Sequence, residues 1–167
     1  MSRITSIVVG VDPGLTGAIA VLVNGAFHTL HDMPIEARPS KGNQIACGSL
    51  VKIAAGISDI DRACTEVMVA VEQVSAMPGQ GVSSMFSFGQ SFGAARMFGY
   101  LVAHARVEMV SPSDWKKMLH ITKTRKSFAL TLARQQFPGA RDLLAREKDV
   151  GRADALLIAH YAYRHLF

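Results

Sequence analysis

The stretch ITSIVVGVDPG (residues 4–14) decides the fold. Its run of apolar, β-branched residues predicts a central strand that is buried on both faces and ends in a turn at Asp12-Pro13-Gly14. Residues 17–23 and 26–31 have the same strand-like composition, and the hairpin signal Asn24-Gly25 joins them. We therefore expect the chain to open with an antiparallel three-stranded meander.

The rest of the chain alternates between helical and strand-like patterns. Helices are predicted at 44–62, 83–103, from 112 onward, 124–137 and 151–166, and further strands at 67–71 and 107–110. Residues 34–42 and 75–81 contain Pro and Gly and are predicted to be loops. This order predicts one α/β domain over residues 1–167, with a mixed five-stranded sheet and helices on both faces.

The composition is that of a globular protein, because 49% of the residues are hydrophobic and 19% are charged. No apolar run is long enough to cross a bilayer, and the first residues do not resemble a signal peptide. We expect a cytoplasmic protein with no membrane partner. Cys47 and Cys64 lack zinc-site spacing and are expected to be small buried side chains.

Positive charge is concentrated in one part of the chain. Residues 112–152 contain ten Lys and Arg and four Asp and Glu, a net charge of +6, whereas the remaining residues sum to −1. A basic region on a nearly neutral body predicts a polyanionic partner such as nucleic acid. The alternative is a solvated helical face.

Three acidic residues occupy the ends of predicted elements. Asp12 ends the first strand, Glu72 ends the fourth, and Asp154 lies in the first turn of the last helix. If those two strands are neighbours, the three carboxylates meet at one edge of the sheet. Clustered carboxylates raise one another's pKa, and a divalent cation such as Mg²⁺ relieves their repulsion. Singly, each has an ordinary explanation as a turn former, a strand end or a helix-terminal charge.

The segments VGVDPGLTG (9–17), VAVEQV (69–74) and RADALLIA (152–159) resemble the motifs of the RuvC-type Holliday-junction resolvases. They occur in the family's order and nearly span the chain. The segments MPGQGVSSMFSFG (77–89) and SDWKK (113–117) resemble the phage and organelle-type branch. The resemblance implies an RNase H-like fold and a homodimeric, Mg²⁺-dependent endonuclease that nicks four-way DNA junctions symmetrically.

The resemblance also implies which residues carry the chemistry. Asp12, Glu72 and Asp154 would be catalytic metal ligands, with Asp149 as the candidate fourth acid. The best-known bacterial members place the last two acids three residues apart, which would fall on Gly151 here, whereas the phage-like branch uses a longer spacing. Two Mg²⁺ ions, or Mn²⁺ in their place, would activate the attacking water and stabilise the leaving oxygen.

Two segments are expected to contact the DNA. One comprises Gly79, Gln80, Gly81, Ser83 and Ser84, where glycines allow close backbone approach. The other comprises Lys116, Lys117, Lys123, Arg125 and Lys126, joined further on by Arg134, whose charges would track phosphates. Lys123 and Lys126 could also stabilise charge at the scissile phosphate, the alternative being ordinary phosphate contact or solvation.

The predicted 83–103 helix has two possible roles. Met85, Phe86 or Phe88 could stack on unpaired bases, or lie in the core or a dimer interface. Phe92, Met97, Phe98 and Leu101 could form a dimer surface or pack against the sheet. Trp115 is expected to be a packing residue without a role in the chemistry.

Other functions fit parts of the pattern. An RNase H-like nuclease could act on other branched DNA or on RNA–DNA hybrids, and a non-catalytic protein could bind junctions without cutting them. Residues 12–17 also resemble the first phosphate loop of the actin and sugar-kinase superfamily. That superfamily uses two such domains around its nucleotide, so we expect no nucleotide cofactor in 167 residues.

Overall fold

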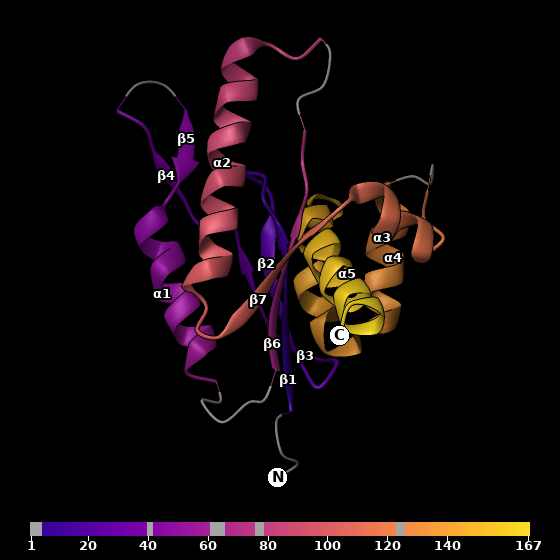
Figure 1. Cartoon of the computed structure of the whole chain (residues 1–167). Coiled ribbons are helices and arrows are strands. Elements are labelled where there is room, and N and C mark those ends of the chain that lie inside the picture. Colours follow the sequence, from indigo (N-terminus) through magenta and orange to yellow (C-terminus); the bar gives the residue numbers. More distant parts are fainter. Residues whose placement is uncertain (1–4, 40–41, 61–65, 76–78, 123–125) are drawn as a thin grey trace.

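The computed structural model describes residues 5–39, 42–60, 66–75, 79–122 and 126–167. Within them, one mixed sheet has the strand order β3-β2-β1-β6-β7 (Figure 1). Its strands are β1 (Ser6–Asp12), β2 (Ala18–Val23), β3 (Ala26–Asp32), β6 (Glu66–Glu72) and β7 (Ala105–Val110). β1, β2 and β3 form the antiparallel meander, and β6 and β7 continue parallel to β1. The predicted five-stranded mixed sheet is confirmed.

Helices cover both faces of this sheet, as expected. α1 (Cys47–Ser58) and α2 (Val82–Leu101) lie on one face, and α3 (Pro112–Met118), α4 (Lys126–Gln136) and α5 (Val150–His165) lie on the other (Figure 1). The central strand serves both layers, because Ile7 and Val9 pack with the α1–α2 side and Val8 packs with the α3–α5 side. This double burial is the reason for the unbroken apolar run of β1.

The contact between α5 and β1 depends on Gly10. A Cβ atom at Gly10 would lie 2.2 Å from the carbonyl oxygen of Ala155 and 2.4 Å from the amide nitrogen of Ala159. The absent side chain therefore lets the helix backbone rest directly on the strand. This contact fixes how far the beginning of α5 reaches along β1.

Some local predictions were wrong. The predicted loop at 34–42 contains β4 (Ile35–Ala37), which pairs with β5 (Asn43–Ile45) as an antiparallel hairpin. Each strand has three residues, and β4 is exposed throughout, so no burial pattern marks them. The helix predicted from residue 44 begins only at Cys47, because β5 occupies 43–45.

Further differences concern connections and element ends. Two 3₁₀ helices that the sequence did not predict, η1 (Pro138–Leu144) and η2 (Glu147–Asp149), connect α4 to α5. Cys47 is exposed rather than buried, because it is the first residue of α1, and Cys64 lies outside the described residues. No helix among the described residues is long and apolar enough to cross a membrane.

Candidate active site

Asp12 and Glu72 end two neighbouring parallel strands. β1 and β6 pair in register up to Val11 and Val71, so the next residue of each strand emerges beside the other at the same edge of the sheet. Both side chains are half-buried. In Figure 1 this edge is the upper one, flanked by the projecting part of α2 on the left and by α3 and α5 on the right. The predicted neighbourhood of the two strands is confirmed.

The carboxyl group of Asp12 is unfavourable as an anion. Burial, and secondly the charge of Glu72, raise its pKa from 3.8 to about 6, although the Gly14 amide and Lys116 act in the opposite direction. The Gly14 N–H donates to Asp12 Oδ1 over 3.4 Å, which is a long hydrogen bond. Asp12 therefore does accept the hydrogen bond expected of a turn-forming residue. That bond does not offset the cost of burying its carboxylate.

Glu72 is held by Trp115, for which the sequence predicts only a packing role. The indole Nε1–H of Trp115 donates to Glu72 Oε1 over 3.0 Å, and Trp115 is fully buried. Lys116 Nζ lies 4.9 Å from the centroid of the Trp115 ring, within cation–π range. No sequence signal marks this pair, because 43 residues separate Trp115 from Glu72.

Asp154 reaches the same end of the sheet from α5. A Cβ atom at Gly151 would lie 2.2 Å from the carbonyl oxygen of Thr16, so the first turn of α5 presses on the β1–β2 loop. The next turn rests on Gly10 through Ala155. Asp154 lies between these contacts and is half-buried. The backbone thus brings all three predicted acids to one end of the sheet.

The side chains do not form a ready-made metal site. Within the described ranges, no group of three or more His, Cys, Asp or Glu side chains is placed so that it could hold a metal ion. The charges that perturb the pKa of Asp12 come from Glu72 and Lys116. Asp12 and Glu72 therefore interact electrostatically.

Asp149 belongs to a different network. It is buried, its Oδ2 accepts the Arg146 amide over 2.8 Å, and its Oδ1 accepts the Arg146 guanidinium over 2.7 Å. These bonds hold the pKa of Asp149 below its usual range. Arg152 lies 3.6 Å from the same carboxylate and donates to Asp32 over 2.6 Å and to the carbonyl of Leu143. The network ties the start of α5 to β3 and η1.

The predicted basic surface is partly internal. Arg134 donates to the carbonyl oxygen of Leu144, and Arg146 and Arg152 pair with the acids described above. Lys116 lies close enough to Asp12 to lower its pKa, and Lys117 is exposed. Lys123 and Arg125 lie outside the described residues. Lys126 begins α4, and its side chain also lies outside the description.

The segment before and at the start of α2 is exposed, as DNA contact would require. Gly79 has a φ of +85°, and Gln80, Gly81, Ser83 and Ser84 are exposed. Phe86 is 67% exposed and Phe88 is half-buried, whereas Phe98 is buried in the core. Of the two roles left open for Phe98, packing against the sheet is the one that the structure shows, because Phe98 lies in the core on that face of α2.

Comparisons with known proteins agree with the motifs. No family model matches the chain. The chain is 36% identical over 97 residues to the chloroplastic Holliday junction resolvase MOC1 of Chlamydomonas reinhardtii. That alignment covers 55% of this chain but 10% of the relative, so the chain spans about a tenth of that protein's length. The resemblance in sequence to a Holliday junction resolvase is thereby confirmed.

The fold matches a solved structure over nearly the whole chain. Thermus thermophilus RuvC, in complex with a Holliday junction substrate, aligns with a TM-score of 0.57 and 20% identity, over 95% of this chain and 94% of that one. A second structure of Thermus thermophilus RuvC aligns with a TM-score of 0.49 and 21% identity. The first alignment shows that the chain has the RNase H-like fold of RuvC.

Proposed function

We propose that this chain, with the fold of RuvC, is a metal-dependent endonuclease that resolves four-way DNA junctions. The observation that carries the proposal is the buried Asp12 carboxyl group beside Glu72, at the end of two parallel strands. Acidic residues with a strongly shifted pKa beside a second charged group are typical of catalytic sites. The sequence likeness to a Holliday junction resolvase supports the choice of substrate.

We propose Asp12, Glu72 and Asp154 as the ligands of Mg²⁺ or Mn²⁺, with two ions per site. Their carboxylate oxygens are the donors that these cations prefer, and a cation would remove the unfavourable burial of charge at Asp12. When bound, the ions would lower the pKa of an attacking water and stabilise the departing oxygen. Because no three acidic side chains in the described ranges are placed to hold a metal ion, binding would require at least one of the three to change its conformation.

The surrounding residues prepare these acids for that role. The Trp115 indole fixes the side chain of Glu72, and Lys116 brings positive charge next to Asp12, where a phosphate of the substrate would approach. Asp149, the fourth acid implied by the resemblance, would have to release Arg146 to become a ligand. We infer that Asp149 acts instead by fixing the start of α5, and thereby the position of Asp154. We also propose that Lys123 and Lys126, whose side chains lie outside the description, stabilise negative charge at the scissile phosphate.

The raised pKa of Asp12 predicts how stability depends on pH and metal. The folded protein releases the Asp12 proton near pH 6 and the unfolded chain near pH 3.8, so this group destabilises the fold increasingly between those values and fully above them. Without metal at pH 8, Asp12→Asn should raise the free energy of unfolding by roughly 2–3 kcal/mol. The gain should vanish at pH 4 in urea titrations with EDTA.

Two controls accompany this measurement. Asp142→Asn removes a charge from an exposed position on η1 and should change stability by less than about 0.5 kcal/mol at both pH values. Mn²⁺ should raise the urea midpoint of the wild type more than that of Asp12→Asn, because a ligand of the folded state stabilises it. If Asp12→Asn gained the same free energy of unfolding at pH 4 and pH 8, the gain could not come from the raised pKa of Asp12.

We propose that the active form is a homodimer that joins through the outer face of α2. Phe86, Met97 and Tyr100 lie on this face and are 67%, 55% and 62% exposed. Gly89 and Gly93 fall between them at helical spacing, with no atoms near the position of a Cβ. A stripe of exposed apolar side chains with glycines at its centre favours close packing against a second α2. Two copies would provide the two active sites that paired nicks require.

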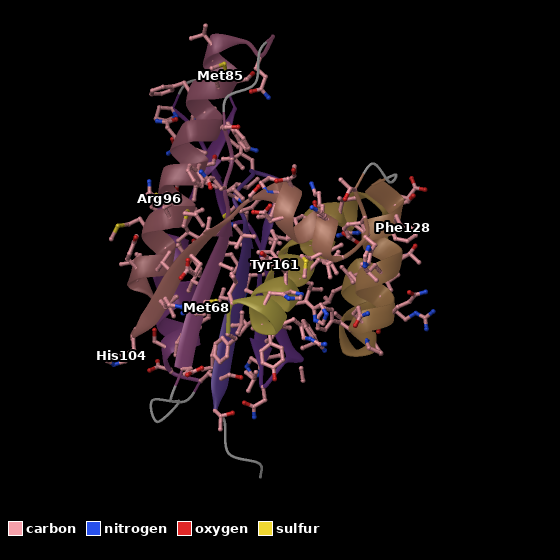
Figure 2. All side chains as sticks on the ribbon, turned by 45° about the vertical axis from the view of Figure 1, so that its right-hand side comes forward. Met68, Met85, Arg96, His104, Phe128 and Tyr161 are labelled. Atoms are coloured by element: carbon pink, nitrogen blue, oxygen red, sulfur yellow. The ribbon has the colours of Figure 1, made fainter. Side chains whose placement is uncertain are left out.

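The mass of the protein in solution tests the dimer. Light scattering should give twice the chain mass of 18.0 kDa for the wild type. Met97→Asp should give the mass of a single chain, because it places a charge within the apolar stripe. Phe128→Asp is the control, since Phe128 is 47% exposed on α4, across the molecule from α2 (Figure 2). A monomeric wild type, or dimeric Met97→Asp, would contradict this interface.

A cleavage panel tests the function itself. The chain should be incubated with Mg²⁺ and with a mobile four-way junction, a flap, a duplex or an RNA–DNA hybrid. We expect paired, symmetric nicks in the junction and much slower cleavage of the other substrates. Preferred cleavage of flaps or hybrids would assign a different nuclease, and binding of junctions without cleavage would assign a non-catalytic protein.

A further inference from the structure

A groove opens directly beside the acidic end of the sheet. Its volume is about 540 Å³, and three elements form its walls: the loop after Asp12, the β4–β5 hairpin and the start of α2. Its lining includes Leu15, Arg38, Asn43, Ser84, Ser87 and Phe88. The hairpin and the first turns of α2, which carry Met85, project together past the sheet (Figures 1 and 2).

The lining of the groove suits an anion. Among the described residues, no Asp or Glu lines the groove, whereas Arg38, four serines and Asn43 do. Gly81 is the N-cap of α2 and has no side chain that could accept a hydrogen bond from the first amides of the helix. The start of a 20-residue helix favours negative charge. Phosphate is the anion for which hydroxyls, amides and a guanidinium are jointly suited.

Arg38 is held in place by neutral partners among the described residues. One terminal nitrogen of its guanidinium donates to Ser87 Oγ over 2.8 Å and to Gln90 Oε1 over 3.1 Å. Both partners are neutral, and Arg38 Nε is buried without a hydrogen-bond partner among the described atoms. A guanidinium fixed by neutral groups is suited to bind a phosphate with little loss of conformational entropy.

We propose that this groove seats a single strand of the DNA substrate beside Asp12, with Arg38 binding a phosphate of that strand. The proposal rests on the proposed nuclease function and adds the path of the strand. Gly14 and Leu15 line the groove two and three residues after Asp12, so a strand that leaves the groove reaches the acidic site directly. The volume is in the range of roughly 300–1,000 Å³ that holds small ligands, which suits nucleotides of an opened strand rather than a duplex.

Phe88 and Leu15 give the groove an apolar wall against which a base can stack. Phe88 is half-buried, so part of its ring is accessible to a base. Bases at the branch point of a junction open more readily than bases inside a duplex. The groove therefore favours DNA that is already opened, which is selection by shape rather than by sequence.

Equilibrium binding of a labelled four-way junction, in EDTA and over a range of salt concentrations, tests the proposal. Arg38→Gln should weaken binding about tenfold and reduce the slope of log K against log salt by about 1. Arg38→Lys should restore the slope, because it retains the charge. Lys52→Gln, which removes an exposed charge from α1 away from the groove, should stay within about twofold of the wild type.

A second variant separates binding from folding. Ser84 is the third residue of α2, where an acid stabilises a helix but would face a bound phosphate. Ser84→Asp should therefore keep or raise Tm while weakening junction binding about tenfold. A methylphosphonate at one position near the cleavage site should weaken wild-type binding and leave Arg38→Gln binding unchanged, which identifies the contacted phosphate.

The results distinguish this inference from the proposed function. Wild-type affinity and salt slope in both Arg38→Gln and Ser84→Asp would overturn the groove assignment, even if the wild type cleaves junctions. If the wild type cuts no branched DNA in the cleavage panel, the proposed function fails. Even without cleavage, the groove would still be supported as a DNA site by two results together. Both variants would bind the junction more weakly, and the methylphosphonate would not weaken binding by Arg38→Gln.

Discussion

Asp12→Asn and Glu72→Gln are each expected to abolish junction cleavage while junction binding persists. Each substitution keeps the size of the side chain and removes one negative charge from the coupled pair at the end of β1 and β6. Gln at position 72 still offers an oxygen to the Trp115 indole, so the local packing is retained. The lost interaction is the charge that would hold a divalent cation.

The expected size of this effect is large. Metal-ion stabilisation of a phosphoryl transition state contributes several kcal/mol, and each 1.4 kcal/mol is a factor of ten in rate. Single-turnover cleavage should therefore slow by about a thousandfold or more in each variant. Asp142→Asn should cut at the wild-type rate. Cleavage by Asp12→Asn at the parental rate would refute the active-site assignment.

Asp12 then illustrates a conflict between stability and function. The same substitution that removes activity should stabilise the metal-free fold at pH 8, because burial opposes the charge that the chemistry needs. A residue retained only to form a turn would behave differently: its loss would destabilise the fold and leave cleavage intact. Measuring both properties of one variant separates the two explanations.

Gly10→Ala is expected to destabilise the fold by about 3 kcal/mol or more. The new Cβ atom would lie 2.2 Å and 2.4 Å from backbone atoms of Ala155 and Ala159, and a helix backbone cannot rotate away as a side chain can. The whole of α5 must shift, which disturbs the core of that face. Because α5 carries Asp154, the folded fraction of this variant should also lose cleavage activity.

Urea titration measures this effect against a matched control. Gly56→Ala introduces the same methyl group into α1, where no atoms lie within 4 Å of the Cβ position. Alanine favours a helix over glycine, so this control should gain about 0.5–1 kcal/mol. A loss of less than 1 kcal/mol for Gly10→Ala would mean that α5 does not rest on β1 in the way described here.

The sheet and its acidic end were predictable because their signals are local and periodic. The apolar run of β1 reports burial on two faces, and the Asn24-Gly25 pair adopts the positive φ angles, 50° and 76°, that the hairpin signal implies. Asp12 and Glu72 end their strands in the sequence, so the parallel pairing of those strands was enough to bring them together.

The remaining features arise from contacts between distant segments. The bond from Trp115 to Glu72 and the bonds from Arg38 to α2 each join residues more than 40 positions apart, and nothing in the sequence indicates which residues pair. The β4–β5 hairpin was missed because its short strands bury little, and burial is what produces a readable pattern. The resemblance implies Asp149 as the fourth acid, and the spacing of the acids does not reveal that Arg146 and Arg152 pair with it.

The most direct test of the central claim is the anomalous difference density of a crystal soaked in Mn²⁺. The account predicts a manganese peak in contact with carboxylate oxygens of both Asp12 and Glu72, with the side chain of Asp154 turned toward it. Density that appears only elsewhere on the protein, or Asp12 and Glu72 without metal at saturating Mn²⁺, would contradict it.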